Sequence, residues 1–381
     1  MTSHAAPILL LNDEQHMLAK TACEFVAQHA PAARLRTFRD SDDGVGFSRD
    51  LWRQMAELGW LGLQVPTEYG GLGLGFFDLC VVLEATGREL MPEPFVSTSL
   101  LGVQSLLLGG SDVQKQAWLP RVASGESLLA VVHDERHKSG RGAAPSIRAR
   151  TVSGGFELSG AAAQVLDAHV ADQLLVSATA EDDAVSLFLV DPGAEGVTIT
   201  RQSRIDGHGA AIVRLESCHV PTDSCVGAVG EGASLLAVVL DRAAIGLSAQ
   251  MLGAAEQAFA DTLAYLKERQ QFDAPIGSFQ ALQHRAVDLY TELALLRSAV
   301  LAAARAVDEQ PDEVERLATL ANALASETLL HVSKEAIQMH GGIGVTDEHD
   351  IGLYLKRAQA TYMSFGVPSQ QRDRWAELHG Y

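Results

Sequence analysis

The stretch RQQFDAPIGSFQ, residues 269–280, carries most of the information about the architecture of this chain of 381 residues. An apolar, helix-forming run precedes it, and Pro275 cannot continue a helix, so we expect a helix that runs from about Gly253 to Glu268 and stops near Pro275. Arg269 would then sit in the last helical turn. There a guanidinium either complements the helix dipole or binds a phosphate with its forked donors, and these residues alone leave both interpretations open.

A second stretch, QMHGGIGVTDE at residues 338–348, follows an apolar helix that we expect to end near Met339. Its glycines permit positive φ and let a ligand approach the backbone, although ordinary helix ends also use glycine. Phe272 and Phe279 would by default belong to the core, and Gln280 would open the next helix.

Composition restricts the class of protein. The net charge of −19 argues against nucleic acid and against anionic membranes as partners, because both need a basic surface. The 47% apolar and 20% charged residues are typical of a soluble globular enzyme. The four cysteines form no CxxC pair, and no leader or run of about 20 apolar residues is present, so we expect reduced thiols in a cytoplasmic protein.

Residue composition and hydrophobic periodicity divide the chain into three regions. Residues 1–125 are mainly helical, residues 126–230 alternate in short β-like stretches separated by turns, and residues 231–381 return to long alanine- and leucine-rich helices. This α–β–α order is unlike a Rossmann chain. The absence of GxGxxG, phosphate-loop, HExxH and GxSxG motifs disfavours nicotinamide dehydrogenases, nucleotide hydrolases, zinc proteases and α/β-hydrolases.

The two stretches, together with WLGLQVPTEYGGLG at residues 60–73 and the α–β–α order, resemble the acyl-CoA dehydrogenases over nearly the full length. The resemblance implies an α+β multidomain fold with an N-terminal helical domain, a small central β-barrel or sandwich domain, and a C-terminal four-helix bundle that carries the dimer interface. It also implies FAD at a subunit interface, α,β-desaturation of an acyl-CoA thioester, and electron transfer to an electron-transfer flavoprotein or similar acceptor.

The same resemblance implies which residues face the cofactor. Those that would contact the pyrophosphate and adenine side of a flavin, or line the same portion, are Arg269, Phe272, Gln280, Gln338, Gly341 and Gly342. In the family these groups serve the FAD that is held mainly by the neighbouring subunit.

The chain departs from the family at the catalytic base. Counting from Gln338 without gaps, the usual glutamate and its following glycine fall on Phe365 and Gly366, and phenylalanine cannot take a proton. Some members place the base on the first helix of the bundle, which here falls on Ala243. Asp241 is nearby, but two helical residues turn a side chain by about 200°, and a solvated pair with Arg242 is the simpler interpretation.

The middle region departs as well. The family's loop for the flavin ring and substrate corresponds to residues 133–140, and the AAAQVLD stretch at residues 161–167 lacks the tryptophan and threonine that pack on the flavin. We predict no metal site. One cluster resembles a ligand set, but it lacks rigid helical spacing, and we expect a solvated loop there: His133, Asp134, Glu135 and His137.

The sequence lacks the family's catalytic base and the side chains that pack on the flavin ring in the subunit's own pocket. The residues that would contact the FAD of a neighbouring subunit are present. We therefore interpret the chain as the non-catalytic partner subunit of an α2β2 enzyme, related to bacterial members that act on bulky acyl-CoAs such as steroid side chains. Three alternatives stay open: a homotetrameric desaturase with an unconventional base, a related flavoprotein oxidase, and a cofactor-free scaffold subunit.

Overall fold

The computed structural model describes residues 10–41, 44–133, 145–181 and 183–381. The chain forms two compact units, and each unit combines segments that are distant in the sequence. The first unit comprises residues 1–35, 76–91 and 244–381, and the second comprises residues 36–75 and 92–243. The three consecutive domains expected from the sequence remain a prediction.

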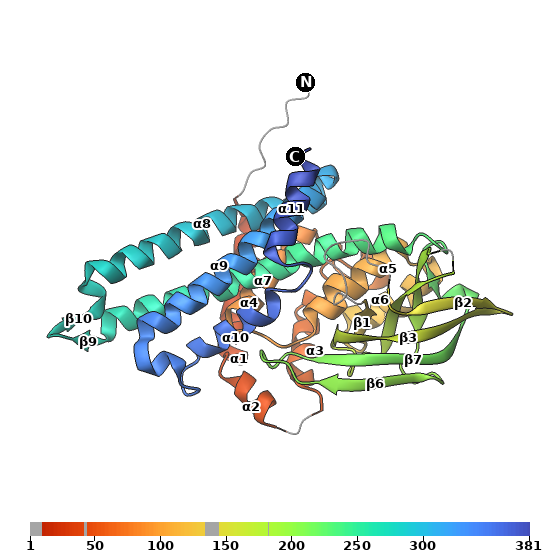
Figure 1. Cartoon of the computed structure of the whole chain (residues 1–381), viewed down its shortest axis with the longest axis horizontal. Coiled ribbons are helices and arrows are strands. Elements are labelled where there is room, and N and C mark those ends of the chain that lie inside the picture. Colours follow the sequence, from red (N-terminus) through yellow and green to blue (C-terminus); the bar gives the residue numbers. More distant parts are fainter. Residues whose placement is uncertain (1–9, 42–43, 134–144, 182) are drawn as a thin grey trace. The chain divides into compact units, whose positions relative to one another are not determined.

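Helices build the first unit (Figure 1). They are α1 (Asp13–His29), α4 (Phe76–Arg88), the C-terminal part of α7 (Gly232–Glu268), α8 (Gln280–Glu309), α9 (Val314–His340), α10 (Ile351–Thr361) and α11 (Pro368–Leu378). The short η6 (Pro311–Glu313) connects α8 to α9, which pack as an antiparallel pair.

Glycines allow α4 and α7 to cross in close contact. A Cβ built on Gly253 would lie 1.9 Å from the carbonyl oxygen of Glu84, and one built on Gly87 would lie 2.0 Å from that of Gln250. Any larger side chain at either position would force the two backbones apart. By length and composition alone α7 could span a membrane, but 72% of its most apolar window is buried, as in the core helix of a globular protein.

Charged side chains join the same helices. Arg297 on α8 donates to Glu84 on α4 at 2.7 Å and to Glu256 on α7 at 2.6 Å, and Arg88 on α4 also donates to Glu256 at 2.5 Å. Burial alone would lower the pKa of Arg297, but the two carboxylates raise it. Asp308 near the end of α8 caps α4, because its carboxylate accepts from the first two amides of that helix.

The second unit combines short helices with all the long strands. Its helical elements are α2 (Arg34–Asp40), which begins just before the unit, α3 (Arg49–Glu57), η1 (Trp60–Gly62), η2 (Thr67–Tyr69), η3 (Phe95–Val103), α5 (Gln104–Gly109), α6 (Asp112–Ala123) and η4 (Thr222–Ser224). Its strands are β1 (Leu129–Val132), β2 (Arg148–Val152), β3 (Gly155–Leu166), β4 (Gln173–Thr179), β5 (Val185–Val190), β6 (Val197–Gln202), β7 (Ala210–Pro221) and β8 (Cys225–Val226).

The strands form one eight-stranded mixed sheet in the order β6-β7-β3-β2-β4-β5-β8, with β1 added in parallel to β4. The longest pair, β3 with β7, is antiparallel and contains two register shifts. The end strands β6 and β8 do not pair with each other, so the described strands form an open sheet and not the closed barrel that the sequence analysis named as one option.

A single apolar core lies on this sheet. All residues of β4 and of the π-helical η3 are buried, whereas β6 is partly exposed along its length. Leu174, Phe188 and Val213 are among the fully buried core side chains. The predicted fold class, helices followed by a β unit and then a helical bundle, is confirmed.

A candidate cofactor-contact site

Helix α7 ends at Glu268, as predicted, so Arg269 lies one residue beyond the helix and not in its last turn. The Arg269 amide still donates to Tyr265 O at 2.8 Å, and Arg269 O accepts from the Ile276 amide at 2.8 Å. Its backbone is therefore held on both sides, which fixes the point from which the guanidinium projects.

A two-residue turn follows Arg269. Strand β9 (Gln270–Gln271) pairs antiparallel with β10 (Ala274–Pro275), and the turn residues Phe272 and Asp273 both adopt left-handed backbone angles, with φ of 55° and 59°. Such a turn suits asparagine and glycine, so a phenylalanine there is strained. Phe272 is also 89% exposed, and its ring centroid lies 6.2 Å from that of Phe279, which is 39% exposed.

The expectation that these two phenylalanines belong to the core is therefore wrong. Hydrophobic type alone suggested burial, but the hairpin carries Phe272 beyond the end of the helical unit. A strained backbone that presents an exposed aromatic ring is typical of a binding surface.

Three predicted contact residues are polar and exposed. Within the part of the chain that the structure describes, the side chains of Arg269, Gln280 and Gln338 make no hydrogen bond or ion pair. Gln280 is the first residue of α8, and its N-cap Phe279 supplies no side-chain acceptor. Phe279 O accepts from the Leu282 and Gln283 amides, so within the described chain the first two amides of the helix are the ones open to an external acceptor.

The glycine turn is the second half of the site. Helix α9 ends at His340, and η7 (Gly341–Val345) follows. Gly341 has φ 66° and ψ −140°, which only glycine adopts easily, and a Cβ built on Gly341 or Gly342 would meet no atom within 4 Å. The backbone there borders open space. Gly344 differs, because its Cβ would lie 2.8 Å from Ile337 O.

A residue that the sequence analysis missed joins the two halves. The Tyr265 ring stacks on His340 with centroids 4.4 Å apart, and its hydroxyl donates to His340 O at 3.2 Å. Tyr265 lies one helical turn before Arg269, and His340 directly precedes Gly341, so the hairpin and the glycine turn lie at the same end of the helical unit (Figure 1). The sequence signal that could have identified Tyr265 was its position one helical turn before Arg269.

No carboxylate occupies the position of the usual base. Residues 364–367 read Ser-Phe-Gly-Val and connect α10 to α11. Phe365 and Gly366 have φ of 60° and 108°. The Gln371 amide group donates to Phe365 O, and the Val367 amide donates to Gln370 Oε1 at 3.3 Å, so side chains of α11 hold this loop in its conformation.

Asp241 is not the solvated residue that we expected. Its exposed fraction is only 4%, and it lies on the N-terminal half of α7. Arg242 donates to Gln104 at 2.7 Å. A buried carboxylate is a more plausible functional group than an exposed one, and its role as a base remains a prediction.

The β unit carries the segment that would face a flavin ring in the family. Gln164 has φ 58° at the second register shift of β3, and its amide donates to Gln202 Oε1 at 2.8 Å. Strand β3 is therefore locally distorted at Gln164, within residues 161–167, a stretch that contains no aromatic side chain. Residues 134–144 lie outside the described residues, and with them Asp134, Glu135 and His137. Among the residues that are described, no group of three or more His, Cys, Asp or Glu side chains could hold a metal.

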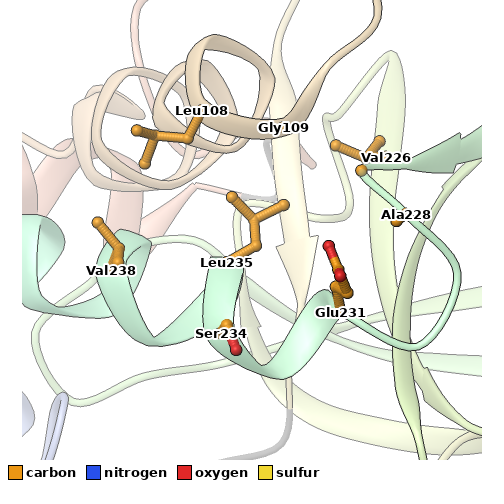
Figure 2. Close-up of a pocket in the computed structure, with 9 residues that line it drawn as sticks. Leu108, Gly109, Val226, Ala228, Glu231, Ser234, Leu235 and Val238 are labelled. Carbon is orange, nitrogen blue, oxygen red and sulfur yellow. The ribbon is translucent and has the colours of Figure 1, made fainter.

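A pocket of about 540 Å³ lies in the second unit between α5, β8 and the first turns of α7 (Figure 2). Leu108, Val226, Leu235 and Val238 give it an apolar wall, and the Glu231 carboxylate turns toward the same space. None of the predicted site residues lines it, and the sequence offered no motif that would have found it.

Comparison with known proteins gives one family. Residues 12–126 match the model of the acyl-CoA dehydrogenase N-terminal domain, and residues 230–378 match that of the C-terminal domain. The acyl-CoA dehydrogenase IpdE2 of Mycobacterium tuberculosis is 31% identical over 359 residues, which cover 94% of this chain and 95% of that protein.

Two solved structures are similar to this chain over nearly its whole length. One is a variant of the Tcur3481-Tcur3483 steroid ACAD, with a TM-score of 0.87, 32% identity and coverage of 97% of this chain and 98% of that one. The other is the ChsE4-ChsE5 complex from Mycobacterium tuberculosis, with a TM-score of 0.88, 27% identity and coverage of 98% and 99%.

Proposed function

The chain belongs to the acyl-CoA dehydrogenase family of FAD-dependent oxidoreductases, and from this premise we propose that it is the partner subunit of a heteromeric enzyme. In this role it completes the FAD site of a second, catalytic subunit and contributes no base of its own. The observation that carries the proposal is the exposed set of Arg269, Gln280 and Gln338 beside an open glycine turn, whose side chains have no partner among the described residues, in a chain that has Phe365 at the predicted base position.

The residues of the helical unit fit FAD by their chemistry. The Arg269 guanidinium suits a pyrophosphate, because it offers paired donors and has no protein partner among the described residues. Gly341 and Gly342 leave room for a phosphate or ribose to approach the backbone. Phe272 offers an aromatic face with 89% exposure. FAD held there would supply the hydride acceptor for the desaturation.

An exposed apolar face supports a second chain beside this site. Helix α8 exposes Val287, Tyr290 and Leu295 by 61%, 65% and 63%, and Val345 in the glycine turn is 76% exposed. Large apolar side chains gathered on one helix that also begins at the cofactor contact are typical of a protein interface. We infer that the catalytic subunit covers this face.

One of the relatives supports a substrate class. Because one of the two similar structures above is a steroid ACAD, we propose a bulky acyl-CoA such as a steroid side-chain thioester as the substrate of the complete enzyme. We also propose an electron-transfer flavoprotein or a similar acceptor and a cytoplasmic location, where the four free cysteines would remain reduced.

Co-expression with a second family member that carries the missing glutamate, encoded beside this gene, tests the proposal. We expect a stable complex with one FAD for every two chains and acyl-CoA turnover, and a colourless, inactive protein when this chain is purified alone. Stoichiometric FAD with robust turnover by the lone chain would refute it.

The burial of Asp241 favours a second candidate function, a homomeric desaturase that uses Asp241 as its base. An isosteric Asp241→Asn replacement separates the two. The partner-subunit proposal expects a change of less than about twofold in the turnover of the complex, provided that the complex still assembles, whereas a base contributes about 10²- to 10⁴-fold.

A further inference from the structure

Three aromatic rings from three segments stack beneath the glycine turn. Tyr265 on α7 stacks on His340 at the end of α9, with centroids 4.4 Å apart, and His340 meets His349, which precedes α10, at 4.5 Å. Tyr265 and His349 are in edge contact at 6.5 Å. His340 is 3% exposed, so the middle ring of the stack is almost completely buried.

Backbone hydrogen bonds fix the proton positions of both imidazoles. His340 Nδ1 lies 2.7 Å from Ala336 O, which can only accept, so the neutral ring carries its proton on Nδ1 and leaves Nε2 bare. His349 Nδ1 accepts from the Ile351 amide at 3.1 Å, so its proton is on Nε2. His340 Nε2 is buried and has no hydrogen-bond partner among the described residues.

We propose that the stack of Tyr265, His340 and His349 is an acid-sensitive support for the glycine turn, closed while His340 is neutral and opened when solvent delivers a proton to its Nε2. The neutral rings pack in contact, and the Tyr265 hydroxyl holds the carbonyl that leads into Gly341. The consequence for the cofactor, weaker contact with the FAD of the catalytic subunit in acid, rests on the proposed function.

Protonation would be poorly tolerated in the closed state. It would place a cation in a buried site, create an N–H donor that has no acceptor, and set that charge against the neighbouring His349 ring. The turn itself contacts this residue, because a Cβ on Gly344 would lie 2.9 Å from His340 Cβ. Opening of η7 is the nearest way to hydrate the charge.

The sign of the effect separates His340 from the other titratable groups nearby. Burial lowers the pKa of His340, and the proximity of His349 adds to this. A lowered histidine pKa gives stabilisation that is fully present above the unfolded value of about 6.5 and is lost as the pH falls through the folded pKa. The closed turn should therefore weaken in mild acid.

Charged groups on the neighbouring elements reach the stack through Asp261 on α7, which interacts with His349. The groups that interact with Asp261 in turn are Asp350 before α10, Glu89 at the end of α4 with its neighbour Arg88, and the Tyr354 hydroxyl on α10. Burial raises the pKa of Asp261 and of Glu89, so both carboxyls favour the folded state as the pH falls. Their contribution is opposite in sign to that of His340.

Hydrogen–deuterium exchange of the full-length chain between pH 8 and pH 5 tests the inference. After correction for intrinsic exchange, we expect the opening of residues 341–345 to increase on acidification, by at most tenfold for each pH unit, because one proton is taken up. His340→Leu should remove this pH dependence. Tyr265→Phe should raise the opening several-fold at every pH and leave the slope unchanged, because it removes one hydrogen bond and no titrating group.

A pH slope that persists in His340→Leu, or slower exchange in acid, would overturn the inference. Should that variant fail to fold, NMR titration of ¹³C-labelled histidine in the wild-type chain replaces it, and the midpoint of His340 must coincide with the midpoint of exchange. Flavin release from the complex at pH 5 and pH 8 is the second arm. Acid-dependent opening without faster flavin release would support the inference and contradict the proposed function, so the two failures are distinguishable.

Discussion

Two segments of the helical unit differ in the chemical groups that they present. One is residues 269–280 with the glycine turn, and the other is residues 364–367. The first keeps exposed polar side chains, a strained aromatic and an open backbone cradle. The second has Phe365 at the position where a count from Gln338 predicts the family's glutamate, and α11 holds the loop with two glutamine side chains. We propose that the first segment keeps its binding role and that the second has lost its catalytic one, within one compact unit.

If the proposed roles hold, cofactor contact and proton abstraction are separable within the fold. A chain that loses its base can still be required if its surface completes the site of another chain. The fold would then be retained because its helix ends have the geometry that the cofactor site needs. Substitutions in each segment test whether cofactor contact and proton abstraction are separate.

Removal of the Arg269 guanidinium should have the largest effect. A charge-assisted hydrogen bond to a phosphate is worth about 1.5–3 kcal/mol, so Arg269→Ala should weaken FAD binding by the co-expressed complex about 10- to 100-fold. The stability of the lone chain should not change, because Arg269 has no partner among the described residues. Flavin retention after gel filtration and the melting temperature of the lone chain give the two values.

Lys334 on α9 provides a matched control, because it is also an exposed cation of the helical unit. Lys334→Ala should leave flavin retention unchanged. Equal losses in both variants would mean that a diffuse positive field acts and not a directed contact, and the binding half of the comparison would fail.

Addition of a methyl group at Gly342 should have the next largest effect. No atom lies within 4 Å of the added Cβ and Gly342 does not have a positive φ, so Gly342→Ala should change the free energy of unfolding by less than about 0.5 kcal/mol. The same methyl group would enter the space expected to receive the cofactor and should weaken FAD binding about tenfold.

Gly344→Ala is the counterpart in the same turn. Its Cβ would lie 2.8 Å from Ile337 O, so this change should destabilise the fold by about 1–3 kcal/mol. Thermal unfolding of the lone chain beside flavin titration of the complex separates the two glycines. If Gly342→Ala binds FAD as well as the wild type does, the open cradle has no role in binding.

Replacement of Phe272 should improve the stability of the lone chain. A non-glycine residue in the left-handed region costs about 1–2 kcal/mol, and Phe272 recovers little of this because it is 89% exposed. Phe272→Gly should therefore stabilise the lone chain by about 1 kcal/mol and weaken its association with the catalytic subunit. Denaturant unfolding and a binding titration check the two signs, and a loss of stability would assign Phe272 to the fold and not to the interface.

The sequence predicted the helices around the site well, because capping and breaking residues mark their ends. Glu268 is the observed last residue of α7, and Gln280 is the observed first residue of α8. The family motifs also identified both halves of the site in advance, although their contact with FAD remains a prediction.

Burial and long-range contacts were the part that could not be predicted. Residue type suggested a buried Phe272 and a solvated Asp241, and the structure has the opposite in both cases, because burial depends on where an element packs and not on its own composition. The contact between Tyr265 and His340 joins residues 75 apart, and no local pattern encodes such a pair. The sequence also did not show that the sheet is open, because strand pairing joins residues that are distant in the sequence.

Restoring the carboxylate should have the smallest effect. Phe365→Glu places a glutamate before Gly366, as in the family, and the loop can accept it because Phe365 already has its unusual φ of 60°. The lone chain should nevertheless show no acyl-CoA turnover, because residues 161–167 still lack the aromatic and hydroxyl groups for a flavin ring, and a base without an aligned hydride acceptor does not desaturate the substrate. Turnover measured with an artificial electron acceptor, with the co-expressed complex as the positive control, decides the matter. Turnover by the lone Phe365→Glu variant would mean that the chain lacks only one catalytic residue. The proposal that cofactor contact and catalysis are divided between two chains would then be wrong.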